Sequence, residues 1–210
     1  MTLVLFVRHG LTEQTGVRLS GWTPGLHLSE AGRAQAASLV ERLDRVPLAA
    51  IYSSPLERCR ETAAPLARAR GLRVVRDRAI GEVGYGEWTN RPLKQLMRTK
   101  LWRVVQSNPA AARFPGGESL LEVQTRVVQA TLRLAAAHRD RAIALVSHGD
   151  PIRLAMSHLA GAPIDHFQRI QIAPASVSAV VRGEGPPRVL TLNAVGALDD
   201  LFPGDGGRMS

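Results

Sequence analysis

Two histidines of this sequence share one local pattern, in which an apolar run is followed by a histidine and a glycine. They are His9 in "FVRHG" and His148 in "LVSHG". A histidine can act as a nucleophile or exchange a proton near neutral pH, and a following glycine lets a ligand approach the backbone closely. One histidine at the end of a strand is more often a structural residue. Two in the same setting favour a shared reaction site.

Two arginines lie at comparable positions. Arg8 directly precedes His9, and Arg58 follows another apolar run, in "SSPLERCRET". A guanidinium group binds phosphate through paired donors in a fixed geometry. Two such groups and two imidazoles can surround a tetrahedral dianion. Arg60, in the same motif as Arg58, is interpreted as a surface residue. The pattern therefore predicts a phosphate-binding site.

The elements that must position these residues alternate between strands and helices. Strands are expected at 3–7, 49–54, 72–77, 142–147, 176–181 and 188–193, and helices at 28–43, 56–71, 119–138 and 152–159. The first strand is apolar throughout, as in strands that are covered on both faces. The alternation predicts an α/β fold with a largely parallel sheet and helices on both faces. Ligands of such sheets bind at the carboxyl ends of the strands.

The length of 210 residues fits one domain. We expect this domain to cover residues 1–202, with a helical insert or lid over about 90–117 and a disordered tail at 203–210. No apolar run approaches the roughly 18 residues that span a bilayer, and no signal-peptide pattern precedes the first strand. We therefore expect a cytoplasmic protein with no membrane partner.

The chain carries a net charge of +9, and its only lysines are Lys94 and Lys100. This charge favours anionic partners, either polymers or metabolites. Nucleic-acid binding is one alternative function, but the arginines are scattered over every expected element and aromatic residues are only 4% of the chain. A nucleic-acid surface needs a basic stripe with stacking rings, so we expect no nucleic-acid partner.

Four motifs occur in the order "VRHGLT", "SSPLERCRETA", "GEVGYGEW" and "SHGDPIR". Together they resemble the histidine phosphatase superfamily, the phosphoglycerate mutase-like proteins, and they span Val7 to Arg153. Two further stretches, "TGVRLSGWTPGLHLSEAG" and "FPGGES", resemble actinobacterial proteins described as probable phosphomutases or phosphatases. The resemblance implies a three-layer α/β/α sandwich with a mostly parallel central sheet.

The resemblance also implies a role for each motif residue. His9 would attack phosphorus and form a phosphohistidine, while Arg8 and Arg58 would bind the phosphate oxygens. His148 would donate to the same oxygens, which favours a protonated imidazole. Glu82 would protonate the leaving oxygen and later accept a proton from water.

A raised pKa would suit Glu82 for this acid and base role. Burial beside Val83 and Tyr85 would raise the pKa, and the phosphate-binding arginines would oppose that rise. Glu87 is the rival carboxylate of the "GEVGYGEW" motif, and we expect it at the surface.

Four further residues are candidates for substrate contact: Thr15, Trp22, Arg91 and Gly149. Thr15 stands where many relatives carry an asparagine, so the pocket beside the phosphate is expected to differ from that of glycolytic mutases. For Arg91 two interpretations stay open: it contacts a second acidic group of the substrate, or it is simply an exposed arginine. These departures, and a chain that is short for a glycolytic mutase, favour a phosphatase for a small phosphate ester. A phosphomutase is the alternative, and a non-catalytic relative is ranked low.

No cofactor or metal is expected. His27, His138, His158 and His166 lack the paired spacing of metal ligands, and Asp150 after His148 does not suffice for a metal site. Cys59 is the only cysteine, and the arginine that a cysteine phosphatase needs six positions later is replaced by Pro65. We expect Cys59 to be a packed helical residue. A homodimer is left open.

Overall fold

The structure, a computed structural model, describes residues 1–198. Its centre is a six-stranded sheet in the order β4-β3-β6-β1-β7-β8. The strands are β1 (Thr2–Arg8), β3 (Leu48–Ser53), β4 (Val74–Arg76), β6 (Ala142–Ser147), β7 (Val177–Arg182) and β8 (Arg188–Ala194). The first four of these pair in parallel, whereas β7 and β8 pair antiparallel. The mostly parallel sheet is confirmed.

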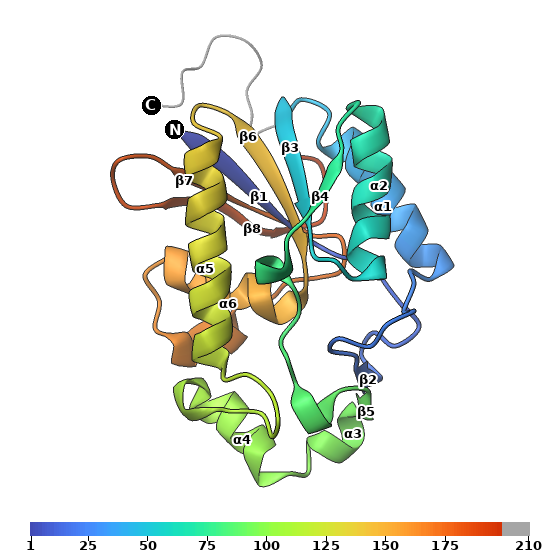
Figure 1. The fold of residues 1–210 in the computed structure, drawn as a ribbon, viewed down its shortest axis with the longest axis vertical. Coiled ribbons are helices and arrows are strands. Elements are labelled where there is room, and N and C mark those ends of the chain that lie inside the picture. The colour runs from blue at the N-terminus through green and yellow to red at the C-terminus, as the bar shows by residue number, and fades with distance from the viewer. Residues whose placement is uncertain (199–210) are drawn as a thin grey trace.

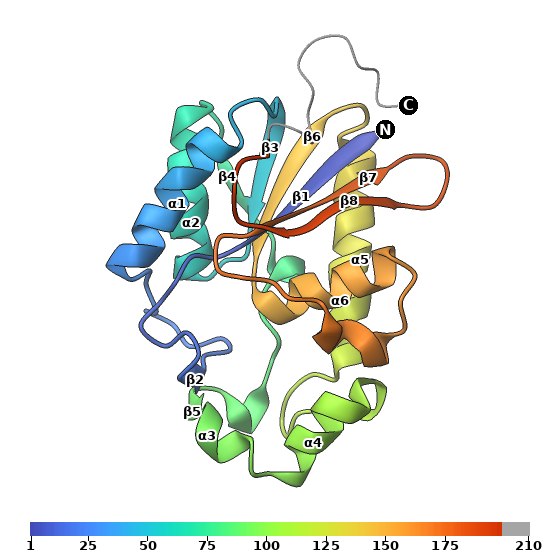
Figure 2. The ribbon, with the colours of Figure 1, turned by 180° about the vertical axis from the view of Figure 1, so that it is seen from behind.

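Helices cover both faces of the sheet. α1 (Glu30–Arg42) and α2 (Glu57–Ala69) lie together on one side, and α5 (Leu120–Ala137) and α6 (Gly149–Leu159) on the other (Figures 1 and 2). Along β1, Leu5 and Val7 belong to the hydrophobic cluster of α1 and α2, while Val4 and Phe6 belong to that of α5 and α6. Both faces of β1 are therefore buried, which explains its continuous apolar sequence.

A smaller region extends beyond the carboxyl ends of the parallel strands (Figure 1). It contains the paired short strands β2 (Arg18–Leu19) and β5 (Arg91–Pro92) and the helices α3 (Leu93–Leu96) and α4 (Lys100–Ser107). The helical insert is divided into two short helices, because Thr99 caps α4 by accepting a hydrogen bond from the Trp102 backbone N–H. The insert expected at about 90–117 thus forms an end wall of the molecule.

Four 3-10 turns complete the described chain: η1 (Arg78–Ile80), η2 (Gly86–Trp88), η3 (Pro109–Ala111) and η4 (Ile164–Arg169). The helix expected at 152–159 begins earlier, at Gly149. Within residues 1–198, no helix is long and apolar enough to cross a membrane. The expected tail at 203–210, and the domain end at 202, lie outside the described residues.

Candidate active site

The two histidine motifs meet at one edge of the sheet because β1 and β6 are neighbouring parallel strands. Arg8 at the end of β1 pairs with Ser147 at the end of β6, and the His9 backbone N–H donates to the Ser147 carbonyl at 2.9 Å. The rings of His9 and His148 consequently lie 5.2 Å apart between centroids. The predicted shared site at the strand ends is present.

A cavity of about 380 Å³ opens at this edge. Its inner end is lined by the predicted residues Arg8, His9, Arg58, Glu82 and Gly149. Thr15 also lines it, and its hydroxyl accepts a hydrogen bond from the Thr12 backbone N–H at 3.0 Å. The cavity therefore joins residues from β1, α2, α6 and two loops.

The environment of His9 keeps one ring nitrogen available for attack. Its Nδ1 lies 2.8 Å from the Gly10 carbonyl, so an Nδ1–H donates there and Nε2 keeps its lone pair. Burial, followed by the charges of Arg58 and Arg8, lowers the pKa of His9 well below its usual value. The imidazole is therefore neutral at physiological pH, as a nucleophile requires.

The two arginines present unused donors beside His9. Arg8 donates from Nη1 to the Ile172 carbonyl at 2.6 Å, and Arg58 donates from Nη2 to the Gly21 carbonyl at 2.7 Å. The buried Nε of Arg8 and the buried Nε and Nη1 of Arg58 have no hydrogen-bond partner among residues 1–198. Buried polar groups are normally paired, so these donors are suited to an anion.

Glu82 is buried, with 9% of its surface exposed. Burial is the main cause that raises its pKa to about 7, and the charge of Asp150 adds to the rise, while Arg58, the Val83 backbone N–H and Arg8 oppose it. A carboxyl group with this pKa can donate and accept a proton near neutral pH. The rival Glu87 is exposed, as expected.

His148 lies in an environment that disfavours a charged ring. It is fully buried, with its Nε2 2.8 Å from the Ser54 hydroxyl and 3.4 Å from the Cys59 sulfur. Burial, then Arg58 and His9, lower the pKa of His148 well below its usual value. Desolvation and neighbouring cations both disfavour the charge in the site without an anion. The protonated imidazole expected beside a bound phosphate dianion stays a prediction. His148 is also not among the described residues that line the cavity.

Two predicted substrate contacts lie elsewhere. Among the described lining residues of the cavity, neither Trp22 nor Arg91 is present. The Trp22 indole N–H instead donates to the Glu82 carbonyl at 2.7 Å, and its ring packs under the Arg78 guanidinium at 4.3 Å. Arg91 is exposed on β5. Trp22 therefore contacts the loop that carries Glu82 from outside the cavity.

A second support for the Glu82 loop comes from α5. Arg126 donates from Nη2 to the Glu82 carbonyl at 2.8 Å and from Nη1 to the Gly81 carbonyl at 2.9 Å. It also forms an ion pair of 2.7 Å with Glu118, whose other oxygen accepts from the Gly84 backbone N–H at 2.6 Å. Both flanks of Glu82 are thus fixed, although no sequence pattern had indicated Arg126.

Polar cavity residues that the sequence reasoning did not assign to the site include Tyr85, Asp150, Arg153 and Arg18. Asp150 accepts a hydrogen bond from the Tyr85 hydroxyl at 2.7 Å and one from Arg153 at 3.0 Å. Asp150 and Arg153 are three residues apart and follow His148 closely, so the spacing of a helix starting at the motif could have indicated them. Arg18, which donates to the side chain of Asn90 at 2.9 Å, carried no such signal.

Beyond the strand ends, one side of the cavity is apolar, and Arg18, Ser20 and Gln106 line the cavity as well. We call the side chains of the apolar side the apolar wall: Leu19, Trp88, Leu93, Trp102, Val105 and Phe114. Four aromatic rings form a continuous row of contacts. Between centroids, the Tyr85 ring lies 4.9 Å from that of Phe114, Phe114 lies 5.4 Å from Trp88, and Trp88 lies 6.4 Å from Trp102. The inner end with Arg8, His9 and Arg58 and the apolar wall therefore belong to one cavity.

Cys59 and the possible metal ligands fall outside this chemistry. Cys59 is fully buried in α2, and burial raises the pKa of its thiol to about 12, so a packed role is confirmed. Within residues 1–198, no group of three or more histidine, cysteine, aspartate or glutamate side chains could hold a metal ion.

A family model described as the histidine phosphatase superfamily (branch 1) matches residues 4–195. The chain belongs to this superfamily. This histidine phosphatase is 31% identical over 207 residues to phosphoserine phosphatase 1 of Hydrogenobacter thermophilus, covering 96% of this chain and 97% of that protein. It is 32% identical to the probable phosphoglycerate mutase GpmB of Yersinia pestis, covering 89% and 87% of the two chains. It is therefore an enzyme of phosphoryl transfer.

Solved structures show the same fold. YhfR of Bacillus stearothermophilus superposes with a TM-score of 0.84 at 26% identity, covering 90% of this chain and 95% of that chain. A mycobacterial glucosyl-3-phosphoglycerate phosphatase superposes with a TM-score of 0.81 at 26% identity, covering 91% and 98%. The three-layer fold of this histidine phosphatase is confirmed. The relatives from Hydrogenobacter and Yersinia do not support the expected closer likeness to actinobacterial proteins.

Proposed function

We propose that this histidine phosphatase hydrolyses a small phosphate monoester by double displacement through a phosphohistidine at His9, without a metal ion. The observation that carries the proposal is the free Nε2 of a neutral His9 beside the unpartnered donors of Arg8 and Arg58. This arrangement supplies a nucleophile and the cations that stabilise charge during phosphoryl transfer.

In the first step, His9 Nε2 forms a bond to phosphorus as the bond between phosphorus and the ester oxygen breaks. Arg8 and Arg58 hold the phosphoryl oxygens and neutralise their charge. Protonated Glu82 gives its proton to the leaving oxygen, so the alcohol departs neutral. A pKa of about 7 leaves Glu82 protonated below neutral pH.

In the second step, ionised Glu82 accepts a proton from water while the water oxygen bonds to phosphorus and the phosphorus–nitrogen bond breaks. His9 recovers its lone pair, and inorganic phosphate leaves. Gly149 assists as a backbone donor at the first turn of α6, where a helix N-terminus favours an anion. His148 keeps the donor role that the motif implies only as part of this proposal, because its ring lies behind His9, 5.2 Å away between centroids, and outside the described lining of the cavity. Thr15 lines the same space. Arg91 and Trp22 take no direct part in this scheme.

A phosphomutase is the second candidate, and the likeness to a probable phosphoglycerate mutase supports it. The two functions differ only in the acceptor of the second step, which is water or a second hydroxyl compound. The likeness to a phosphoserine phosphatase over 97% of that protein favours water. A cytoplasmic location and a homodimer remain predictions from the sequence.

The test measures both acceptors at once. The full chain is incubated with a panel of phosphate monoesters, in the presence of a chelator, with and without 3-phosphoglycerate as acceptor. We expect release of inorganic phosphate to exceed transfer, and the chelator to have no effect. His9→Ala should abolish both activities, while His158→Ala, at an exposed histidine, should change neither. Transfer that exceeds hydrolysis would establish the mutase instead.

A further inference from the structure

The outer half of the cavity is built for a different kind of group than its inner end. Three members of the apolar wall, Leu19, Leu93 and Trp102, are only partly buried. They come from three separate elements, β2, α3 and α4, and all three line the cavity. Partly exposed apolar side chains that converge on one hollow indicate a binding site for an apolar group.

α4 contributes to this site with one face. Trp102, Val105 and Gln106 are spaced as neighbours on a helix, and all three line the cavity. Arg103, on the same helix, is exposed and is not among the described lining residues. The helix therefore turns a specific apolar face inward.

Trp102 offers a flat, supported ring. It stacks on the buried Trp88 at 6.4 Å between centroids with an angle of 24° between the planes, and Trp88 in turn contacts Phe114. The rings of Trp88 and Trp102 both line the cavity, and a ring that already packs on a buried neighbour loses little conformational freedom when a ligand contacts it. Such aromatic surfaces bind planar apolar groups well.

The two arginines of the outer half differ in how their charge is met. Arg153 already donates to Asp150 at 3.0 Å, so its charge is compensated. Arg18 is oriented by the neutral carbonyl and side-chain oxygens of Asn90, to which its Nε donates at 2.8 and 2.9 Å, so its charge is not compensated by these contacts. The cavity of about 380 Å³ lies in the range of pockets for drug-sized ligands, which are larger than a three-carbon phosphate ester.

We propose that this enzyme acts on phosphate monoesters of alcohols that carry an apolar, ring-bearing body, which packs on Trp102 and its neighbours in the apolar wall. This inference rests on the proposed function, because the phosphoryl group must occupy the inner end of the cavity. Neutral polar groups of the body would meet Gln106, which lies beside Trp102 on the same face of α4.

Binding of two phosphonates tests the proposal without relying on turnover. 3-Phenylpropylphosphonate and propylphosphonate share a phosphonate on the same three-carbon chain and differ in the ring alone. Titration calorimetry with the full chain should give a dissociation constant about tenfold to a hundredfold lower for the phenyl compound. Equal dissociation constants would overturn the proposal, even if the protein hydrolyses esters through His9.

Variants locate the effect. Trp102→Ala should weaken binding of 3-phenylpropylphosphonate by about tenfold and change that of propylphosphonate by less than about twofold. Leu93→Ala, on a different helix, should also weaken binding of 3-phenylpropylphosphonate more than that of propylphosphonate. It replaces Trp102→Ala in this test if that variant does not fold. Arg103→Ala, on the outer face of α4, should leave both constants unchanged. Equal loss for both compounds in Trp102→Ala and Leu93→Ala would contradict a site for the body of the ester.

Turnover then connects binding with substrate class. For ethyl and 2-phenylethyl phosphate, whose leaving groups are both primary alcohols, kcat/KM should favour the phenyl ester by about tenfold or more. The ratio should fall towards one in Trp102→Ala. A preference of the wild-type protein for phosphoserine over 2-phenylethyl phosphate would overturn the proposal while leaving the phosphohistidine mechanism intact.

Discussion

Arg58 shows most clearly how a single residue can serve chemistry rather than stability. It is 1% exposed, yet two of its guanidinium nitrogens have no hydrogen-bond partner within residues 1–198. A buried cation without full pairing costs folding free energy, and an apolar replacement of similar length is often neutral or stabilising. We therefore expect Arg58 to serve the anion of the proposed reaction more than the fold.

Arg58→Met should lower kcat/KM by about 100-fold or more. Its free energy of unfolding in urea should be unchanged or higher by up to about 2 kcal/mol. Vanadate should raise the melting temperature of the wild-type protein but not of this variant. Arg60→Met is the matched control and should affect none of these measurements. A marked loss of stability in Arg58→Met alone would show that Arg58 supports the fold.

Glu82 should govern the pH dependence of the first step. Its pKa of about 7 lies above its usual value, so its protonated form persists to neutral pH and is lost as the pH rises further. Because the first step needs the proton, kcat/KM should fall on the alkaline side with an apparent pKa near 7. A pH profile of Glu82→Gln should lack this limb.

Asp150→Asn removes one cause of the raised pKa of Glu82 but keeps the size of the side chain. The alkaline limb of kcat/KM should move to lower pH by roughly 0.5–1 unit. The positive neighbours Arg8 and Arg58, which oppose the rise, remain in place. Asp44→Asn makes the same chemical change at an exposed site and should not move the limb. A shift to higher pH in Asp150→Asn would refute this electrostatic role.

At the scale of elements, the first turn of α1 crosses the loop after β1 at very close range. A Cβ atom on Gly32 would lie 2.0 Å from the Leu11 carbonyl oxygen, and one on Gly10 would lie 2.6 Å from the Gly32 carbonyl oxygen. Both obstacles are backbone atoms, which cannot move aside without shifting an element. The two glycines therefore let α1 pack directly behind the His9 loop.

Gly32→Ala should lower the free energy of unfolding by about 1–3 kcal/mol, because overpacking outweighs the gain in helix propensity. Urea denaturation measures the change. Gly185→Ala is the control, since a Cβ at that position would meet nothing within 4 Å in the described part of the chain. Equal stability of the two variants would mean that α1 can move away from the loop freely.

Elements that a contiguous stretch of residues determines were predicted from the sequence, whereas features that depend on distant contacts were not. Continuous apolar runs indicated β1 and β6, and the resemblance of the motifs to a known family indicated the meeting of Arg8, His9, Arg58 and Glu82. The break between α3 and α4 was missed, although Thr99 is a typical N-cap residue. Trp22 was predicted to contact the substrate because it is close to the His9 motif in the sequence. Sequence distance does not show on which side of the Glu82 loop a side chain lies.

Charge and desolvation could not be predicted in the same way. The pKa of His148 depends on complete burial beside Arg58 and His9, which brings together residues from three parts of the chain. The apolar wall likewise combines β2, α3 and α4, which are far apart in sequence or individually short. Such sites result from tertiary packing, and no single periodicity reveals them.

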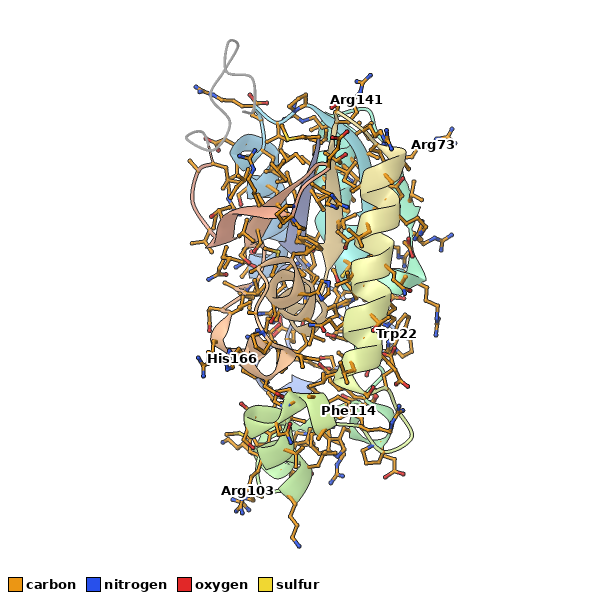
Figure 3. All side chains as sticks on the ribbon, turned by 90° about the vertical axis from the view of Figure 1, so that its left-hand side faces the viewer. Trp22, Arg73, Arg103, Phe114, Arg141 and His166 are labelled. Carbon is orange, nitrogen blue, oxygen red and sulfur yellow. The ribbon has the colours of Figure 1, made fainter. Side chains whose placement is uncertain are left out.

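At the scale of the whole molecule, the net charge of +9 is spread rather than concentrated. Arg73 and Arg141 lie near one end of the molecule, and Arg103 on α4 lies at the other (Figure 3). A nucleic acid needs a continuous basic surface. The spread of arginine charges instead attracts anions in general. In the proposed function, specific phosphate binding takes place in the cavity.

Duplex DNA should bind weakly and lose its binding by about 0.2 M salt, with a salt slope equivalent to only one or two phosphate contacts. Electrophoretic mobility shifts at several salt concentrations measure this slope. DNA in excess should not inhibit hydrolysis of a small phosphate ester at 0.2 M salt. A slope that corresponds to five or more contacts, with binding that persists at that salt, would contradict the small-molecule assignment.

The central claim is the covalent phosphohistidine at His9, and its direct test is to quench the reaction at high pH during turnover and map the modified residue by mass spectrometry. We predict an acid-labile phosphoryl group on Nε2 of His9 that forms and decays at rates compatible with kcat. It should be absent in His9→Ala and present at the wild-type level in His158→Ala. Undiminished hydrolysis by His9→Ala, or a phosphoryl group on another residue that turns over at kcat, would contradict the mechanism.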